Sequence, residues 1–182
     1  KLAGTVLADA PVVRVSAVNG QGLDTLVAAI DEMLASVPPA KDIGRPRLWV
    51  DRVFTIKGAG TVVTGTLQGG SVRVDDELEV VPGGHTLRVR GLQSHNRQVE
   101  EAEIGGRLAV NVAGYGVDEI ERGDALVAPG TLAASERFNA WVRTVPSLTR
   151  PLARESRLKL YVGTAERMAR VRLLDAELLE AG

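Results

Sequence analysis

The chain of 182 residues contains no cysteine and only two histidines. Without cysteine it can form no disulfide, no thiolate metal site and no cysteine nucleophile. The two histidines, His85 and His95, are separated by a spacing that is not typical of metal ligands. We therefore expect no metal site.

Long apolar runs are missing as well. No segment approaches the roughly 18 consecutive apolar residues of a membrane-spanning helix, and no signal peptide opens the sequence. A composition of 45% hydrophobic and 25% charged residues, with a formal net charge of -1, is typical of soluble globular proteins. These features predict a cytoplasmic protein with no membrane partner.

Motifs for nucleotide binding and catalysis are also scarce. The segment "KGAGTVVTG" is rich in glycine, but it leads into a β run and contains no Gly-Lys-Ser/Thr. A phosphate loop must instead open a helix, so that backbone N–H groups meet the phosphate. We interpret Gly58-Ala59-Gly60 as a hairpin turn. Because serine, threonine and histidine are scattered, the sequence predicts no catalytic residues.

The first part of the sequence predicts a strand, a loop and a helix. Residues 11–17, "PVVRVSA", are β-prone, and "VNGQG" is typical of a turn. Apolar residues from Leu23 to Leu34 then follow the period of one helix face. Residues 38–46 contain three prolines and are typical of an interdomain linker.

Residues 47–130 predict an all-β domain. Short β runs alternate there with glycine-rich turns, as in an antiparallel barrel or sandwich. The predicted strands cover residues 48–57, 61–67, 71–74, 77–81, 86–94, 107–112 and 125–128.

A second β module is predicted over residues 131–182. Apolar and polar residues alternate over 138–143 and 158–162, as in half-buried strands. Few strands are available to close a barrel, so we expect unpaired edges. Residues 175–181 are compatible with either a short helix or a further strand.

Charge is distributed unevenly along the sequence. Residues 131–182 carry nine Lys/Arg and six Asp/Glu, whereas residues 1–130 carry 13 and 17. A basic segment can bind a polyanion such as RNA. A charged face that only meets solvent is the alternative, and composition leaves both open.

One charged residue stands out in the strand predicted at "RLWVDRVFTI". Alternation places Arg52 on the same face as Leu48, Val50, Phe54 and Ile56, where it interrupts an apolar stripe. A buried guanidinium without a partner is costly. Arg52 is therefore expected either to pair with a nearby acid, with a β-bulge turning it, or to face an anionic ligand.

Several motifs together resemble one family. "DRVFTIKGAGTVVTGT", "GSVRVDDELEVVP", "RVRGLQSHNRQVEEAEIGGRLAVNV" and "IERGDALVAPG" resemble the second domain of translational GTPases of the elongation factor Tu type. Within that group, "LQSHNRQVEEAEIGGRLAVN" is similar to the selenocysteine-specific factors, the SelB family. "LKLYVGTAERMARVRLL" resembles their third domain, although family members often have His where this chain has Tyr161.

The resemblance implies a mainly β fold. An antiparallel β-barrel of the elongation-factor type, domain II, is expected over residues 47–130, followed by a partial second barrel, domain III, over 131–182. A strand and helix from the end of an α/β GTPase domain would precede them over residues 1–37. Ser16 and Ala17 match the last guanine-contacting motif of that domain.

The resemblance also implies a function. The family carries selenocysteyl-tRNA to the ribosome in a GTP-dependent manner and grips an mRNA hairpin through domains that this sequence lacks. GTP and Mg²⁺ belong to the intact relatives. Because the phosphate loop and switch motifs are missing here, this chain is expected to bind neither and to be inactive alone.

The resemblance finally implies site residues. Asp51, Arg52 and Arg107 match the aminoacyl pocket for selenocysteine. A selenol is ionised near neutral pH while serine stays neutral, so two guanidiniums would stabilise only the selenolate. Further arginines are weaker candidates for contacts with the tRNA backbone. These are Arg150, Arg154, Arg167 and Arg170.

Two other functions remain open on the sequence alone. The chain could come from another elongation or initiation factor of the same type, whose pocket holds an ordinary amino acid. It could also be a β-barrel binding module without a tRNA role, in which Arg52 forms a structural ion pair.

Overall fold

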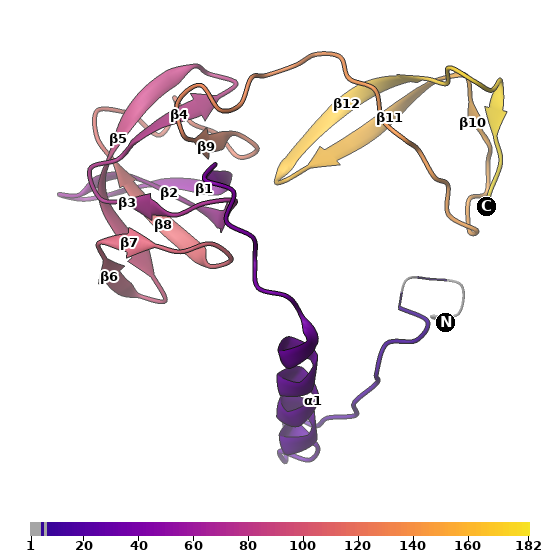
Figure 1. Ribbon diagram of the computed structural model, residues 1–182, viewed down its shortest axis with the longest axis horizontal. Coiled ribbons are helices and arrows are strands. Elements are labelled where there is room, and N and C mark those ends of the chain that lie inside the picture. The colour runs from indigo at the N-terminus through magenta and orange to yellow at the C-terminus, as the bar shows by residue number, and fades with distance from the viewer. Residues whose placement is uncertain (1–4, 6) are drawn as a thin grey trace. The chain divides into compact units, whose positions relative to one another are not determined.

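A computed structural model describes Thr5 and residues 7–182, which divide into two compact units between Pro39 and Ala40 (Figure 1). The domain boundaries at residues 37/38, 46/47 and 130/131 stay predictions. No described helix is both long and apolar enough to cross a membrane.

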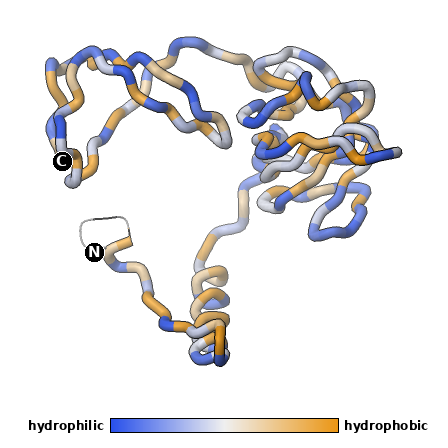
Figure 2. Tube along the Cα trace, turned by 180° about the vertical axis from the view of Figure 1, so that it is seen from behind, coloured by the Kyte–Doolittle hydropathy of each residue, from blue (hydrophilic) through white to orange (hydrophobic). Residues whose placement is uncertain are grey.

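The first unit contains the predicted helix, α1 (Leu23–Ser36). Gly22 precedes it with φ of 78°, and a Cβ there would lie 2.2 Å from the carbonyl oxygen of Arg14, so only glycine fits this turn. The helix ends at Val37, which is extended and is followed by two prolines. Figure 2 shows the apolar residues of α1, none of which is buried.

The strand predicted over residues 11–17 is not formed. Ser16 instead belongs to a turn, because its N–H donates to the carbonyl of Gln21 and its carbonyl accepts from Gly20. A β-prone run becomes a strand only beside a partner, and no described strand pairs with it. This part of the predicted strand–helix pair is therefore wrong for the described chain.

The second unit is built around a closed antiparallel barrel of six strands. In order around the barrel they are β4 (Glu77–Val81), β9 (Ala125–Val127), β1 (Arg47–Ile56), β2 (Gly60–Gln68), β8 (Arg107–Val112) and β5 (His85–Ser94). Pairing of β5 with β4 closes the ring, so each of these six strands is paired on both sides. The predicted mainly β fold, with a barrel of the elongation-factor type, is confirmed.

Three short strands complete the barrel. β6 (Arg97–Val99) extends the sheet beside β5, and β3 (Val72–Arg73) pairs with β7 (Glu101–Ala102). β6 and β7 were not predicted. The turn at Gly58-Ala59-Gly60 joins β1 to β2 as a hairpin, because Ile56 pairs with Gly60, and that prediction is confirmed.

The barrel core consists of the inward side chains of these strands. Its fully buried members include Leu48, Val50, Val63, Leu67, Val89, Leu108 and Val110. The residues before β1 lie against the barrel, since the N–H groups of Ile43 and Arg45 donate to the carbonyl of Gly69 at 3.1 and 2.9 Å.

A β-bulge in β1 changes the predicted alternation. Val50 pairs with Gly65 but Arg52 pairs with Thr64, so Asp51 is the extra residue on β1. Beyond the bulge Val53 packs against the core and Arg52 is exposed. The prediction that Arg52 shares a face with Leu48 and Val50 is therefore wrong, because the bulge shifts the alternation by one residue.

Residues 131–182 form two small antiparallel pairs. β11 (Glu155–Val162) and β12 (Ala165–Arg172) make a hairpin, and β10 (Leu152–Ala153) pairs with β13 (Leu178–Leu179). The strand predicted over 158–162 is confirmed, and the segment 175–181 contributes a strand. The strand predicted over 138–143 is wrong: the segment has no pairing partner among the described strands, and Trp141 is 100% exposed.

Candidate functional site

The bulge in β1 places Asp51 at the centre of a polar cluster. Its side chain is only 17% exposed, and its carboxylate accepts three hydrogen bonds. Arg107 donates from Nη1 to Oδ2 at 2.5 Å and from Nη2 to Oδ1 at 2.9 Å, and Thr64 Oγ1 donates to Oδ1 at 2.6 Å. The two-pronged contact fixes both the position and the rotation of the Arg107 guanidinium.

The three residues come from three neighbouring strands. Asp51 lies on β1, Thr64 on β2 directly opposite Arg52, and Arg107 begins β8. The sequence analysis named Asp51 and Arg107 but missed Thr64. The hairpin register was a usable signal, because counting back from Gly58-Ala59-Gly60 places Thr64 near Asp51 on the adjacent strand.

These partners keep the Asp51 carboxyl ionised. Partial burial raises its pKa, but the hydrogen bonds from Thr64 and Arg107 and the charges of Arg107 and Arg52 together lower it by more. The net pKa of Asp51 lies below its ordinary value of 3.8. Asp51 therefore carries a negative charge at neutral pH and offsets the charge of Arg107.

Arg52 projects from the bulge into solvent. Its charge contributes to the lowered pKa of Asp51, so the two groups are within electrostatic reach of each other. Within the described residues Arg52 forms no ion pair. The neighbouring Asp51 carboxylate is paired with Arg107 instead. The β-bulge suggested by the sequence is therefore present, but Arg52 does not form the local ion pair suggested with it among the described residues.

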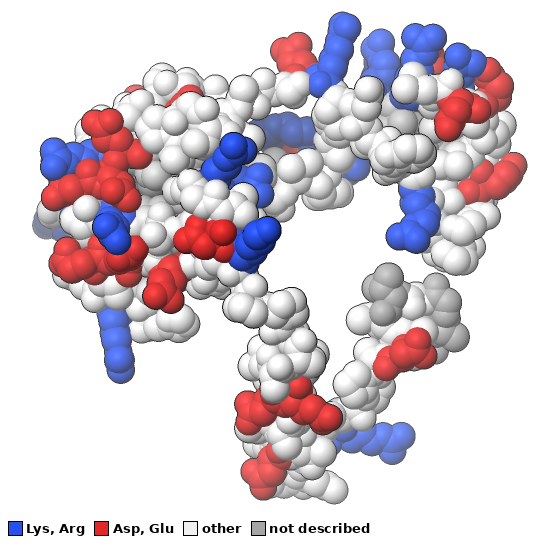
Figure 3. Space-filling model, viewed as in Figure 1, with Lys and Arg blue, Asp and Glu red and all other residues white. Residues whose placement is uncertain are grey.

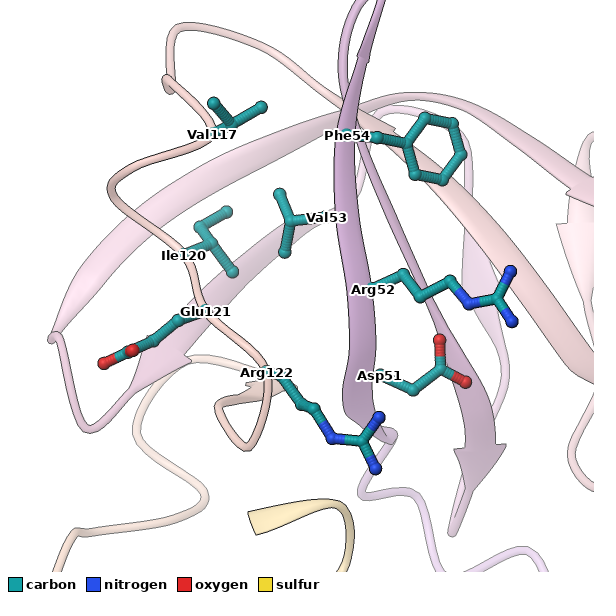
Figure 4. A pocket seen from close by; sticks show the side chains of 8 residues that line it. All are labelled: Asp51, Arg52, Val53, Phe54, Val117, Ile120, Glu121 and Arg122. Atoms are coloured by element: carbon teal, nitrogen blue, oxygen red, sulfur yellow. The ribbon is translucent and has the colours of Figure 1, made fainter. Parts of the chain in front are cut away.

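A shallow pocket of about 480 Å³ adjoins this cluster (Figure 4). Figure 4 shows Arg52 projecting from β1 and Arg122 from the connector before β9, with Asp51 between them in this view. Glu121 and four apolar side chains form the rest of the lining, with Phe54 and Val117 at the surface. The pocket thus combines two guanidinium groups and two carboxylates with apolar walls.

Sequence reasoning missed most of this lining. Arg122 stands in "IERGD", one of the segments that carry the family resemblance, so that motif was the available signal. Phe54 had been placed on the inner face by simple alternation. The bulge instead leaves it 40% exposed beside the pocket.

The other predicted site residues lie elsewhere. Ser16 and Ala17 belong to the first unit, where Ala17 is exposed. The described residues contain no group of three or more His, Asp or Glu that could hold a metal ion.

The candidate arginines of the C-terminal part have different surroundings. Arg154 pairs with Glu177, and Arg150 lies just before β10. Arg170 stands directly opposite Arg157 on the hairpin, and Arg167 lies on the other face. In Figure 3 several Lys and Arg side chains project from the hairpin.

One face of the hairpin is cationic. The register places Arg157, Lys159, Arg170 and Arg172 on this face, together with two acids, Glu155 opposite Arg172 and Glu166 opposite Tyr161. Lys159 is paired with Glu166 at 2.5 Å. The direct opposition of Arg157 and Arg170 is unfavourable without an anion between them. This arrangement fits a contact with phosphate.

The comparisons with known proteins agree with the barrel fold. Residues 60–127 match the family described as elongation factor Tu domain 2, which is the class of domain that the fold defines. The chain as a whole is similar to selenocysteine-specific elongation factors. It is 42% identical over 181 residues to the selenocysteine-specific elongation factor of Desulfomicrobium baculatum, covering 100% of this chain and 28% of that protein.

One further relative and one solved structure are similar to most of this chain. Elongation factor Tu 2 of Streptomyces avermitilis is 35% identical over 86% of this chain and 43% of its own length. The crystal structure of elongation factor SelB from Methanococcus maripaludis, in its apo form, superposes with a TM-score of 0.70 at 28% identity, covering 92% of this chain and 39% of that one. The chain thus spans less than half the length of each of these relatives.

Proposed function

We propose that this chain is the part of a selenocysteine-specific elongation factor that receives the aminoacyl end of selenocysteyl-tRNA. The full-length protein would carry that tRNA to the ribosome in the cytoplasm, in a GTP-dependent manner. An mRNA hairpin would be bound through domains outside this chain. The observation that carries the proposal is the arrangement of Asp51, Arg52 and Arg107 at the bulge of β1.

The arginines have different tasks in this proposal. Asp51 fixes the Arg107 guanidinium from one side, yet 56% of the Arg107 side chain stays exposed, so further N–H groups can donate to a ligand. Among the residues that the structure describes, Arg52 has no competing ion pair, so it can turn towards the same ligand. The two guanidiniums would stabilise a selenolate and leave a neutral serine hydroxyl without comparable gain.

Discrimination then follows from charge. A hydrogen bond to a charged group contributes roughly 1.5 to 3 kcal/mol, which corresponds to about one to two decades of affinity per bond. Serine has the same side-chain connectivity as selenocysteine, with oxygen in place of the larger selenium, and a pocket that recognised size alone would reject the smaller side chain poorly. Charge recognition is therefore the feature that makes a selenocysteine-specific pocket out of this barrel.

The proposal is tested in the full-length protein with Arg52→Ala and Arg107→Ala. Dissociation constants are measured for selenocysteyl-tRNA and seryl-tRNA, with Arg90→Ala as the matched control, because Arg90 is an exposed barrel arginine that neither lines the pocket nor contacts Asp51. We expect Arg52→Ala and Arg107→Ala each to bind selenocysteyl-tRNA about 10- to 100-fold more weakly and seryl-tRNA nearly as before. Equal losses for both tRNAs would refute selenolate recognition.

A second candidate function is that of an elongation factor for ordinary aminoacyl-tRNAs, favoured by the similarity to elongation factor Tu 2. In that case the wild-type protein would bind seryl-tRNA as tightly as selenocysteyl-tRNA. A β-barrel without a tRNA role would bind neither. The same binding series separates the three functions.

A further inference from the structure

The tip of the β11–β12 hairpin contacts the barrel beside the pocket. Gly163 and Thr164 form the two-residue turn of this hairpin, with φ of 58° at Gly163, as expected for glycine at the first turn position. A Cβ on Gly163 would lie 2.2 Å from Cδ2 of Trp49, so its backbone rests against the indole ring. The hydroxyl of Thr164 donates a hydrogen bond of 2.5 Å to the carbonyl of Val50.

The next residue of the tip, Ala165, contacts the segment that contains Arg122 and Gly123. Ala165 is only 9% exposed, and a Cβ on Gly123 would lie 3.0 Å from its Cα. Gly123 directly follows Arg122, which lines the pocket. Three consecutive tip residues therefore contact the two backbone segments from which the pocket arginines Arg52 and Arg122 project.

Val50 links these two segments. Its N–H donates to the carbonyl of Asp124 at 2.9 Å, and its carbonyl accepts from the N–H of Gly123 at 3.0 Å as well as from Thr164. The next residue, Asp51, is the bulge. A bulged strand lacks the regular ladder that would otherwise fix its direction, so these bonds, together with the β2 pairs on either side of the bulge, hold the backbone from which Asp51 and Arg52 project.

The tip is held in shape by its own side chains. Glu166 is bound by Lys159 and Tyr161, and these bonds lower the pKa of Glu166 and raise the pKa of Tyr161. The three residues bridge the two strands one pair away from the turn, since Tyr161 pairs with Glu166. These side-chain contacts therefore stabilise the turn that carries Thr164.

We propose that Thr164 is a positioning residue of the pocket: by holding the carbonyl of Val50, it fixes the bulge that aims Asp51 and Arg52. The residue touches no ligand itself. Its effect on tRNA selectivity rests on the proposed function, whereas its effect on the bulge does not. A displacement of about 1 Å at a binding group is enough to cost up to about 100-fold in a precisely arranged site.

The test uses three variants of the full-length protein. Thr164→Val removes the hydroxyl at nearly constant shape, and Thr164→Ser keeps it. Thr144→Val is the matched control, because Thr144 also donates a 2.5 Å hydrogen bond to a backbone carbonyl, that of Glu180. Amide hydrogen exchange is followed in peptides covering residues 49–54, 121–124 and 85–94, together with the affinities for the two tRNAs.

We expect local loosening in T164V alone. Exchange should accelerate about tenfold in residues 49–54 and 121–124 and stay unchanged in 85–94. Selectivity for selenocysteyl-tRNA over seryl-tRNA should fall by a similar factor, and T164S should restore both. Uniform acceleration across the barrel would make Thr164 a general stabilising residue, and unchanged exchange in 49–54 would show that the bond does not hold the bulge; either result overturns the proposal.

Failure of the proposed function gives a different pattern. If the wild-type protein does not distinguish the two tRNAs while T164V still loosens residues 49–54, selenolate recognition is refuted and the positioning role stands. Should T164V fail to fold, Thr164→Ala replaces it in the same comparison. A loss of selectivity in T164S, which keeps the hydroxyl, would also contradict the positioning role.

Discussion

Arg107 and Asp51 are 56 positions apart in the sequence, yet the Arg107 guanidinium donates two parallel hydrogen bonds to the two carboxylate oxygens of Asp51. The contact joins β8 to the bulge of β1 across β2. It shields the negative charge of Asp51 and leaves Arg52 and Arg122 as guanidiniums without an ion pair among the described residues lining the pocket. Four predictions follow from this barrel and hairpin.

The pH dependence of stability should report Asp51. Its pKa is lower in the folded chain than in the unfolded chain, so the ionised carboxylate stabilises the fold. This contribution is complete above the ordinary value of 3.8 and is lost as the pH falls through the lower folded pKa. Urea unfolding at a series of acidic pH values should therefore show a smaller loss for Asp51→Asn than for the wild type. Asp118→Asn, at an exposed position, should follow the wild type.

Thr64→Val should weaken the polar cluster. The hydroxyl donates to an Asp51 carboxylate that is mostly buried, so its loss should cost about 1 kcal/mol of unfolding free energy and raise the pKa of Asp51. Thr66→Val is the matched control, because Thr66 lies on the same strand but is exposed. Equal effects of the two variants in denaturant unfolding would contradict the role of Thr64.

Gly65→Ala should damage the barrel beside the bulge. An added Cβ would lie 2.1 Å from the carbonyl oxygen of Trp49 and 2.6 Å from Cδ2 of Leu48. Forcing strands apart in this way costs roughly 1 to 3 kcal/mol, measured as a lower unfolding free energy. Gly91→Ala, on β5, should be nearly neutral, since nothing lies within 4 Å of its added Cβ. A neutral Gly65→Ala would show that β1 can shift freely.

Arg170→Ala should weaken tRNA binding without lowering the unfolding free energy, if Arg170 contacts phosphate. Removing one member of the opposed Arg157–Arg170 pair relieves repulsion, so the unfolding free energy should stay constant or rise slightly. If the pair contacts phosphate, tRNA affinity should fall and the slope of log affinity against log salt should decrease by about 1. Arg143→Ala, outside the hairpin, should leave that slope unchanged. An unchanged slope in Arg170→Ala would exclude a phosphate contact at this position.

Secondary structure was predicted correctly from the sequence where it depends on residues that are close together along the chain. The helix at Leu23–Ser36 and the hairpin at Gly58-Ala59-Gly60 have their periodicity and turn residues within a few positions, and both were predicted. Residues 77–81 were predicted with the bounds that the structure has. Strands that need a distant partner were harder, and the runs at 11–17 and 138–143 failed because β-propensity alone does not supply one.

The site was only partly accessible for the same reason. Alternation cannot reveal the bulge at Asp51, because the shift arises from pairing with β2. Asp51, Arg52 and Arg107 were named through the family motifs, and the pairing of Asp51 with Arg107 emerged only from the closed barrel. Thr64 and Arg122 escaped because each is ordinary for its position and gains its role from its neighbours in space.

The contact between Gly163 and Trp49 gives the protein an intrinsic optical probe. Of the two tryptophans, Trp141 is fully exposed, whereas Trp49 lies under the Arg47 guanidinium, 5.3 Å from the ring centre, and against the hairpin tip. Emission from Trp49 therefore depends on whether the hairpin is seated beside the pocket. In a Trp141→Phe background the fluorescence of a single indole would follow that seating in real time.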